Sequence, residues 1–390
     1  MNSLKAHFLL DPRITFLNHG SYGATPRPVF ETYQNWQLRL EREPVNFINN
    51  ELTALLKEAR LALGRYLKAD ADDLVYVPNA TFGLNVIARA LPLKPGDEVL
   101  TTDHEYGATY NLWSYICRKH GAALIQQPIS FPVASEAEAL DEIWQGVTPR
   151  TKVIFLSHIT SPTALRLPVA ALCQRARAAD MITVIDGAHA PGQIELDLDA
   201  LGADFYVGNC HKWLCSPKGA AFLHTRRERQ ALIEPLVVGW GWGEKRKPSR
   251  ESAYVEAMQR LGTDDLSAYL TVPAAIGFQE QHHWPEVRTR CHDLLAATLR
   301  QASELTGLRP LYPAPGPSFA QMAVIPLPPV HDLAAFTRCL YEKYRIQVPC
   351  IAWQDRQFLR VSVQGYNSEE DLDALMEALH AELPEFTGTT

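Results

Sequence analysis

The sequence of 390 residues predicts an α/β fold with a mostly parallel central sheet, helices on both faces of the sheet, and a smaller C-terminal α+β domain. Three observations support this prediction. The chain is long enough for two packed domains, its central part alternates strand-like and helix-like segments, and its C-terminal part has a different order. We expect an N-terminal segment over 1–50, a large α/β domain over 51–290 and a small domain over 291–390.

Short apolar runs bounded by polar or turn residues mark the strands of the central part. In chain order the expected strands are 74–78, 97–102, 152–157, 181–188, 203–209 and 219–225. Helical patterns follow the first three of these strands, over 80–91, 107–121 and 168–180. This alternation is typical of open α/β sheets, in which ligands bind at the carboxyl ends of the strands.

The C-terminal part combines fewer strands with longer helices. We expect a helix over 331–344 and strands over 345–353 and 357–363. A final helix over 368–383 has apolar residues at helical spacing and begins with a serine that is followed three positions later by an acidic residue. This mixture indicates the small α+β domain.

Composition excludes several classes of partner. The net charge is −7 and no basic block is present, which argues against nucleic acid or an anionic membrane surface. No stretch approaches the roughly 20 apolar residues of a membrane helix, and the N-terminal residues do not resemble a secretory signal. Seven scattered cysteines indicate reduced thiols in a cytoplasmic protein. Because Cys210 and Cys215 have no matching second pair, no metal site is expected.

Asp186 and Lys212 are the strongest candidates for chemistry. Asp186 ends one apolar strand, and Lys212 follows the next strand, so both can reach the same edge of the sheet. A buried lysine readily loses its proton, and a neutral amine can attack an aldehyde. A lysine for the aldehyde and an acid for the ring nitrogen are what pyridoxal 5′-phosphate (PLP) requires. From these two residues alone, a structural ion pair remains an equal alternative.

A phosphate site is expected where the strand 74–78 meets the helix 80–91. Ala80 and Thr81 lie at the N-terminus of that helix, where free amide groups and the helix dipole attract anions. The Thr81 hydroxyl adds a donor. An ordinary helix cap formed by Asn79 or Thr81 is the alternative interpretation.

Longer motifs give the sequence a family resemblance. "DGAHAPG", "LGADFYVGNCHKWL" and "GAAFL" resemble the central signature of the class V aminotransferase superfamily of fold-type I PLP enzymes. "LNHGSYGATPRPV", "TDHEYGA" and "LRVSVQGYN" look like its isopenicillin N epimerase-like branch. These matches extend over 16–367. The resemblance implies a PLP enzyme that acts on a small amino-acid substrate.

The resemblance also implies roles for individual residues. Lys212 would form the Schiff base with PLP and transfer protons at the substrate Cα, and Asp186 would bind the ring nitrogen. His189 would reach the phenolic oxygen of the ring. The remaining cofactor contacts would come from Ala80, Thr81, Asn209 and His211.

Further implied residues concern the substrate and the partner subunit. Arg360 would bind the substrate carboxylate through two hydrogen bonds. Asn18 and His19 would close the pocket from the N-terminal segment. Thr263 would reach the phosphate bound by the other subunit, which implies a homodimer with a shared active site.

The reaction type stays open between three chemistries. Epimerisation, β-elimination by a carbon–sulfur lyase, and transamination all begin with loss of the Cα proton. Tyr106 is expected to cover the cofactor ring, with His104 as the rival residue. Epimerisation needs a second proton donor besides Lys212, and Tyr106, His104 or His19 could serve. We expect an epimerase first, then a lyase or an aminotransferase, and keep a PLP-binding protein without turnover as the alternative from another class.

Overall fold

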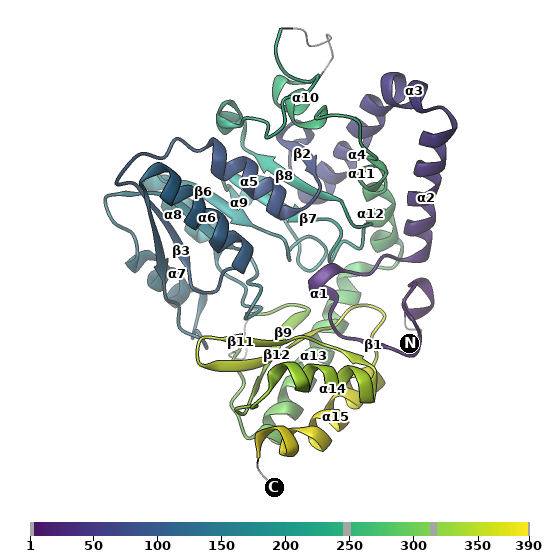
Figure 1. Cartoon of the computed structure of the whole chain (residues 1–390), viewed down its shortest axis with the longest axis vertical. Coiled ribbons are helices and arrows are strands. Elements are labelled where there is room, and N and C mark those ends of the chain that lie inside the picture. Colours follow the sequence, from purple (N-terminus) through teal and green to yellow (C-terminus); the bar gives the residue numbers. More distant parts are fainter. Residues whose placement is uncertain (1–3, 245–250, 313–317, 389–390) are drawn as a thin grey trace.

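The computed structural model describes residues 4–244, 251–312 and 318–388, and its main feature is a seven-stranded sheet in the large domain (Figure 1). The strand order is β2-β8-β7-β6-β5-β3-β4. The strands are β2 (Leu74–Val77), β3 (Glu98–Thr102), β4 (Ala123–Gln127), β5 (Thr151–Ser157), β6 (Ile182–Asp186), β7 (Phe205–Asn209) and β8 (Ala221–Thr225). The pairs from β4 to β7 are parallel, whereas β8 is antiparallel to both neighbours. The predicted mostly parallel sheet is therefore confirmed.

Helices cover both faces of this sheet because the side chains of its strands alternate between two apolar cores. Val153 and Phe155 of β5 join the core that includes α5 (Ala80–Ala90) and α6 (Gly107–His120). Ile154 and Leu156 belong to the other core, which includes α8 (Val169–Ala178). The helices expected after the first strands are thus present on both faces.

The small domain is built on a three-stranded antiparallel sheet with the order β11-β12-β9. Its strands are β9 (Met322–Leu327), β11 (Cys350–Trp353) and β12 (Arg356–Ser362), and its helices are α13 (Trp284–Thr306), α14 (Leu333–Tyr344) and α15 (Glu369–Thr387). The expected serine cap of the last helix is confirmed, because Ser368 and Asp371 form a capping box.

The expected single strand over 345–353 is wrong. The segment divides into β10 (Ile346–Gln347), which pairs with β1 (Thr15–Phe16), and β11, which pairs with β12. Pro349 lies at the division and has no N–H to donate, although its carbonyl accepts a hydrogen bond from the Arg360 N–H at 3.0 Å. The change of partner brings the N-terminal segment next to the small domain.

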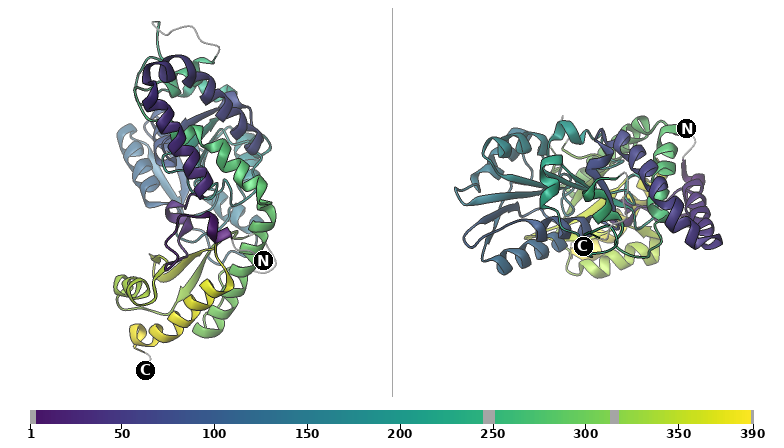
Figure 2. Two further views of the ribbon diagram at one scale, coloured as in Figure 1. Left: turned by 90° about the vertical axis from the view of Figure 1, so that its right-hand side faces the viewer. Right: turned by 90° about the horizontal axis from the view of Figure 1, so that it is seen from above.

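Two long helices near the N-terminus complete the large-domain flank (Figure 2). α2 (Arg27–Arg42) packs against α11 (Ser267–Leu270), and α4 (Leu52–Leu67) packs against α12 (Val272–Gln281). In the part of the chain that the structure describes, no helix is long and apolar enough to span a membrane. The division at residues 50 and 290 stays a prediction, and the second boundary falls within α13.

Candidate active site

The carboxyl ends of neighbouring strands bring the predicted chemistry together. Asp186 is the last residue of β6, and its Cα partner in β5 is Ser157. Asn209 is the last residue of β7, and Lys212 lies in the turn that follows it. Strand ends of this kind form the ligand crevice of an open α/β sheet. The candidate site therefore lies at this edge.

Lys212 carries an amine that burial makes easier to deprotonate. Its Nζ lies 3.3 Å from the His189 Nε2. Burial lowers the pKa of Lys212 to about 8, with the Asp186 carboxyl opposing this shift and the Arg360 charge adding to it. An amine of this kind is neutral in a useful fraction of molecules near neutral pH, as a Schiff-base nucleophile requires.

The turn that carries Lys212 is held by the N-terminal segment. The Lys212 carbonyl lies 3.0 Å from the His19 Nε2 and accepts a hydrogen bond from the Cys215 N–H at 3.0 Å. Gly23 has a φ of 71°, and a Cβ on it would lie 2.2 Å from the His211 carbonyl oxygen. Only glycine fits this close approach without strain. The main chain beneath the amine is therefore fixed.

Asp186 has a free acceptor where a ring nitrogen would be bound. The residue is 5% exposed, and its Oδ1 accepts a hydrogen bond from the Ala188 N–H at 2.8 Å. Its Oδ2 has no hydrogen-bond partner among the described residues. Burial raises the pKa of Asp186, while the Ala188 amide and the Lys212 charge oppose this shift. The free oxygen fits a cationic N–H donor.

The N-terminus of α5 combines capped and free amides. The Asn79 side chain accepts a hydrogen bond from the Phe82 N–H at 2.9 Å, and Asn209 Oδ1 accepts one from the Ala80 N–H at 2.9 Å. Thr81 is exposed, and its N–H and hydroxyl have no partner in the described part of the chain. Asn79 thus provides the ordinary cap, while Thr81 remains available to an anion.

Arg360 is buried without a counter-ion. It is 5% exposed; its Nη1 donates to the Ser161 carbonyl at 2.7 Å and lies 3.0 Å from Ser161 Oγ, and its Nη2 donates to Ser21 Oγ at 3.1 Å. Its Nε is buried without a partner, and no carboxylate contacts the guanidinium within the described residues. Burial lowers the pKa of Arg360 to about 10. Such a group suits a substrate carboxylate.

Asn18 and His19 reach the site in different ways. Asn18 accepts a hydrogen bond from Ser21 Oγ at 2.6 Å and so connects to Arg360. His19 is completely buried, with its Nδ1 3.0 Å from the Tyr366 hydroxyl and its Nε2 used by the main chain of Lys212. Burial lowers the pKa of His19 to about 3, so the ring is neutral. His19 therefore stabilises the turn through its contact with the Lys212 carbonyl.

Tyr106 and His104 differ sharply in exposure. His104 is completely buried, with its Nδ1 2.7 Å from Thr163 Oγ1 and its Nε2 3.1 Å from the Ile129 carbonyl. Tyr106, at the start of α6, is 49% exposed. Only Tyr106 of this pair can present its ring to a ligand without breaking buried hydrogen bonds.

His189 and His211 flank the lysine with neutral rings. The His189 Nδ1 accepts a hydrogen bond from Trp213 Nε1 at 3.4 Å, and burial lowers the pKa of His189 well below its ordinary value. The His211 Nδ1 lies 2.9 Å from the Ala220 carbonyl, and burial lowers its pKa to about 4. Neither ring adds a positive charge next to Lys212.

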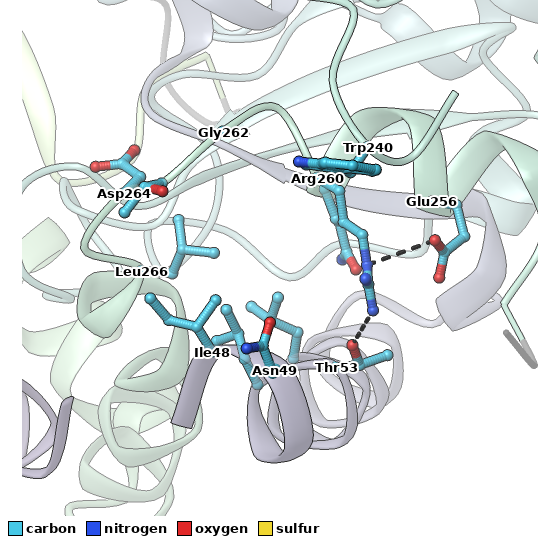
Figure 3. Close-up of a pocket in the computed structure, with 13 residues that line it drawn as sticks. Ile48, Asn49, Thr53, Trp240, Glu256, Arg260, Gly262, Asp264 and Leu266 are labelled. Carbon is cyan, nitrogen blue, oxygen red and sulfur yellow. Dashed lines mark hydrogen bonds and ion pairs between the residues drawn. The ribbon is translucent and has the colours of Figure 1, made fainter. Parts of the chain in front are cut away.

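Thr263 is one of the residues that line a cavity of about 500 Å³ (Figure 3). Thr263 is exposed, and apolar residues of α4 and the ring of Trp240 line the same cavity. Neither Lys212 nor Arg360 lines it. The role of Thr263 towards a partner subunit stays a prediction.

The sequence reasoning assigned no role in this site to three of its residues. Ser161 and Ser21 hold the guanidinium of Arg360, and Glu105 lies buried beside Asp186. All three lie in or beside loops that follow strands or precede helices, where a polar side chain can serve as a cap or a ligand contact. Only their partners in space distinguish these roles.

The chain resembles known proteins over nearly its whole length. The family model described as "Aminotransferase class-V" matches residues 24–375. The chain is 38% identical over 382 residues to an isopenicillin N epimerase from Amycolatopsis lactamdurans, covering 95% of both chains. It is 34% identical over 385 residues to an isopenicillin N epimerase from Streptomyces clavuligerus, covering 97% of both chains.

Relatives of lower sequence identity include proteins that are described by a different activity. A probable chloroplastic L-cysteine desulfhydrase from Arabidopsis thaliana is 26% identical over 404 residues, with 95% of this chain and 83% of the relative covered. Among solved structures, a C-DES mutant with glycine covalently linked to the PLP cofactor has a TM-score of 0.81 at 23% identity. That match covers 95% of this chain and 97% of the other. At this identity the structural match supports the fold alone.

Proposed function

The chain belongs to the class-V aminotransferase family, and from this membership we propose that it is a PLP-dependent amino-acid epimerase like its isopenicillin N epimerase relatives. One observation carries the proposal. The Lys212 amine is buried, has a lowered pKa and lies at the same strand ends as Asp186. A structural ion pair does not require a lysine that deprotonates easily, whereas a Schiff base does.

The residues present fit PLP. When bound, PLP supplies an aldehyde that captures an amine and a ring that accepts the electron pair left at Cα. Lys212 would hold the aldehyde carbon, and Asp186 Oδ2 would accept a hydrogen bond from the ring nitrogen. Thr81 and the N-terminus of α5 would bind the phosphate, and His189 would face the phenolic oxygen.

The epimerase proposal assigns one proton transfer to each face of the substrate Cα. Arg360 binds the α-carboxylate and fixes the orientation of the Cα–H bond. The neutral amine of Lys212 removes the proton from one face, and the Tyr106 hydroxyl donates a proton to the other face. One C–H bond breaks and one forms, so no oxidant or reductant is required. Exchange with water then restores both groups, which the exposure of Tyr106 permits.

Tyr106 is the best second donor among the three that the sequence suggested. Both ring nitrogens of His19 and of His104 are occupied by buried hydrogen bonds. Releasing either ring would leave buried polar groups unpaired, at about 1–3 kcal/mol each. Tyr106 is half exposed and incurs no such cost.

A carbon–sulfur lyase is the second candidate because the family also contains the L-cysteine desulfhydrase relative. Lys212 would remove the same Cα proton, and the electron pair would then expel a sulfur group from Cβ. Transamination and PLP binding without turnover are the remaining outcomes.

We infer a homodimer in which Thr263 approaches the partner's phosphate. Thr263 is exposed, and Trp240 on the same cavity belongs to a run of exposed apolar side chains with Val237, Val238 and Trp242, as expected for a surface that a partner covers. Light scattering of the purified protein tests the dimer.

All seven cysteines lie in described segments and are free thiols, which supports a reducing, cytoplasmic setting.

The decisive experiment supplies PLP and candidate amino acids in deuterated water. Deuterium at Cα with inversion of configuration is expected for the epimerase. Pyruvate with release of a thiol would indicate the lyase, and a keto acid with pyridoxamine phosphate would indicate transamination. An absorption spectrum that no amino acid changes would contradict all three reactions.

Borohydride trapping tests the lysine itself. We expect the reduced adduct on Lys212 and its loss in Lys212→Ala. Lys119→Ala changes an exposed lysine of α6 and should leave the adduct unchanged. An adduct on any other residue would overturn the proposal.

A further inference from the structure

Glu105 is a buried carboxyl group directly before Tyr106, and the proposed reaction does not use it. The residue is 9% exposed and follows β3 in the sequence. Its Oε1 accepts a hydrogen bond from Thr102 Oγ1 at 2.9 Å. It also bonds Ser157, the last residue of β5, so it joins the ends of two adjacent strands.

The bonds to Ser157 use both the main chain and the side chain. The Ser157 N–H donates to Glu105 Oε2 at 3.0 Å, and the two side-chain oxygens are 2.5 Å apart. Ser157 is also the register partner of Asp186 on β6. Glu105 is therefore attached to the strand end immediately beside Asp186.

Two carboxyl groups this close in a buried site resist ionising together. Burial raises the pKa of Glu105 to about 7, and the Asp186 charge adds to this shift, while the bonds from Ser157 and Thr102 oppose it. No cation contacts Glu105 among the described residues. Burial also raises the pKa of Asp186, while the Ala188 amide and the Lys212 charge oppose this shift.

The rest of this loop is fixed independently. Trp353 Nε1 donates to the Asp103 carbonyl at 3.0 Å, and the His104 ring lies 4.5 Å from the Trp353 ring, centre to centre. Glu105 provides the remaining attachment, on the side of the central sheet. Tyr106 follows it and is the exposed member of the loop.

We propose that Glu105 is a positioning residue that ties the Tyr106 loop to the strand end beside Asp186. This inference deepens the proposed function and rests on it. The two carboxyl oxygens accept hydrogen bonds from the Thr102 hydroxyl and from the N–H and hydroxyl of Ser157, so one side chain attaches the loop to both strand ends. Tyr106 is thereby held where it can face the cofactor.

The chain offers a closely matched control. Glu142 on α7 (Glu136–Gln145) accepts hydrogen bonds from the Ser130 N–H at 2.7 Å and from the Ser130 hydroxyl at 2.6 Å. The same pair of bonds therefore exists outside the site. Glu142→Ala should leave cofactor binding unchanged.

The test compares Glu105→Gln with Glu105→Ala by titrating apoenzyme with PLP and recording visible circular dichroism. Glutamine keeps an acceptor oxygen and can donate to the Ser157 hydroxyl, so we expect Kd within about twofold of the parent chain and the same dichroic band. Alanine removes the bonds to Thr102 and Ser157 together, so it should raise Kd by at least about tenfold and weaken the band. Melting curves of each variant verify folding.

Each outcome bears on the proposal. An unchanged Kd and band in Glu105→Ala would overturn the positioning role. Binding as weak as that of Glu105→Ala in a folded Glu105→Gln would show that these hydrogen bonds do not position the loop, and would contradict the proposal. If Glu105→Ala does not fold, Ser157→Ala removes the hydroxyl contact from the other side and should weaken the band, and an unchanged band would contradict the proposal. Absence of the Lys212 adduct in the parent chain would instead overturn the proposed function.

Discussion

Arg60 and Arg360 are both buried, yet their guanidinium groups have opposite surroundings. Arg60, on α4, forms an ion pair with Glu251 and donates hydrogen bonds to the Gln259 side chain at 3.0 Å and the Ala71 carbonyl at 3.2 Å. Arg360, on β12, contacts only neutral oxygens and has a free Nε in the described structure. The fully paired arginine serves the fold, whereas the unpaired arginine incurs a cost that only an anionic ligand offsets.

The same contrast separates the cavity of Figure 3 from the candidate site. Arg260 in that cavity donates to Thr53 Oγ1 at 2.6 Å and lies 3.5 Å from the Glu256 carboxylate. Its charge therefore has a partner within the chain. The candidate site contains Arg360, which has no carboxylate partner among the described residues, and the easily deprotonated Lys212. We therefore base the choice of candidate site on uncompensated charge and not on cavity size.

We expect the largest effect on stability from breaking the ion pair of Arg60. Arg60→Ala removes the buried cation that pairs with the buried Glu251 carboxylate, while Lys57, which is partly exposed, still lies 3.2 Å from that carboxylate. We expect a loss of about 3–5 kcal/mol in the free energy of unfolding. Urea denaturation measures this loss, while the activity of the molecules that remain folded should be unchanged. Full stability in this variant would remove the contrast with Arg360.

The second effect appears in catalysis. Arg360→Ala should raise KM and lower kcat/KM by roughly 10- to 150-fold, because one charge-assisted hydrogen bond to a carboxylate contributes roughly 1.5–3 kcal/mol. The free energy of unfolding should stay the same or increase, since an uncompensated buried charge is removed. Arg360→Lys should recover little, because an ammonium cannot form the two-pronged contact. Parent kinetics in Arg360→Ala would contradict the substrate role.

The third prediction concerns a buried histidine and compares it with an exposed one. His224 on β8 is 2% exposed, and neither ring nitrogen has a hydrogen-bond partner among the described residues; burial lowers its pKa to about 4 from an ordinary 6.5. The unfolded chain therefore binds the proton more readily, and stability is lost as pH falls from 6.5 towards 4. We expect His224→Leu to be more stable than the parent chain by roughly 2 kcal/mol at pH 5, and by less at pH 7.5. His331→Leu, at an exposed position, should show no such pH dependence.

The smallest effect concerns an exposed arginine with a partner. Arg175 lies 3.0 Å from Asp141, with side chains 40% and 72% exposed. Arg175→Ala should change the free energy of unfolding by less than about 1 kcal/mol. A loss as large as that of Arg60→Ala would mean that pairing, and not burial, determines the cost. Added salt should reduce even this small difference.

Much of this arrangement was predictable from local patterns. The strands that end in Asp186 and Asn209, and the serine cap of α15, follow from apolar runs and capping residues. The edge strand β4 was missed because its burial is low and its sequence is partly polar. The strand over 345–353 was wrong because Pro349 redirects the chain between two partners.

The residue types of the site were predictable from the sequence, but the orientations of their side chains were not. Lys212, Asp186 and Arg360 carry charge in apolar sequence surroundings, which is a signal that one chain can provide. The inward orientation of His19 and His104 depends on partners far away in the sequence, such as Tyr366. No local pattern contains that information.

The contact between His19 and the Lys212 carbonyl joins residues 193 positions apart. During synthesis the N-terminal segment leaves the ribosome long before its binding partner exists. Contacts of such long sequence separation form late and slowly. We therefore expect the turn that carries Lys212 to reach its final conformation only when the N-terminal and central parts of the polypeptide meet, late in folding.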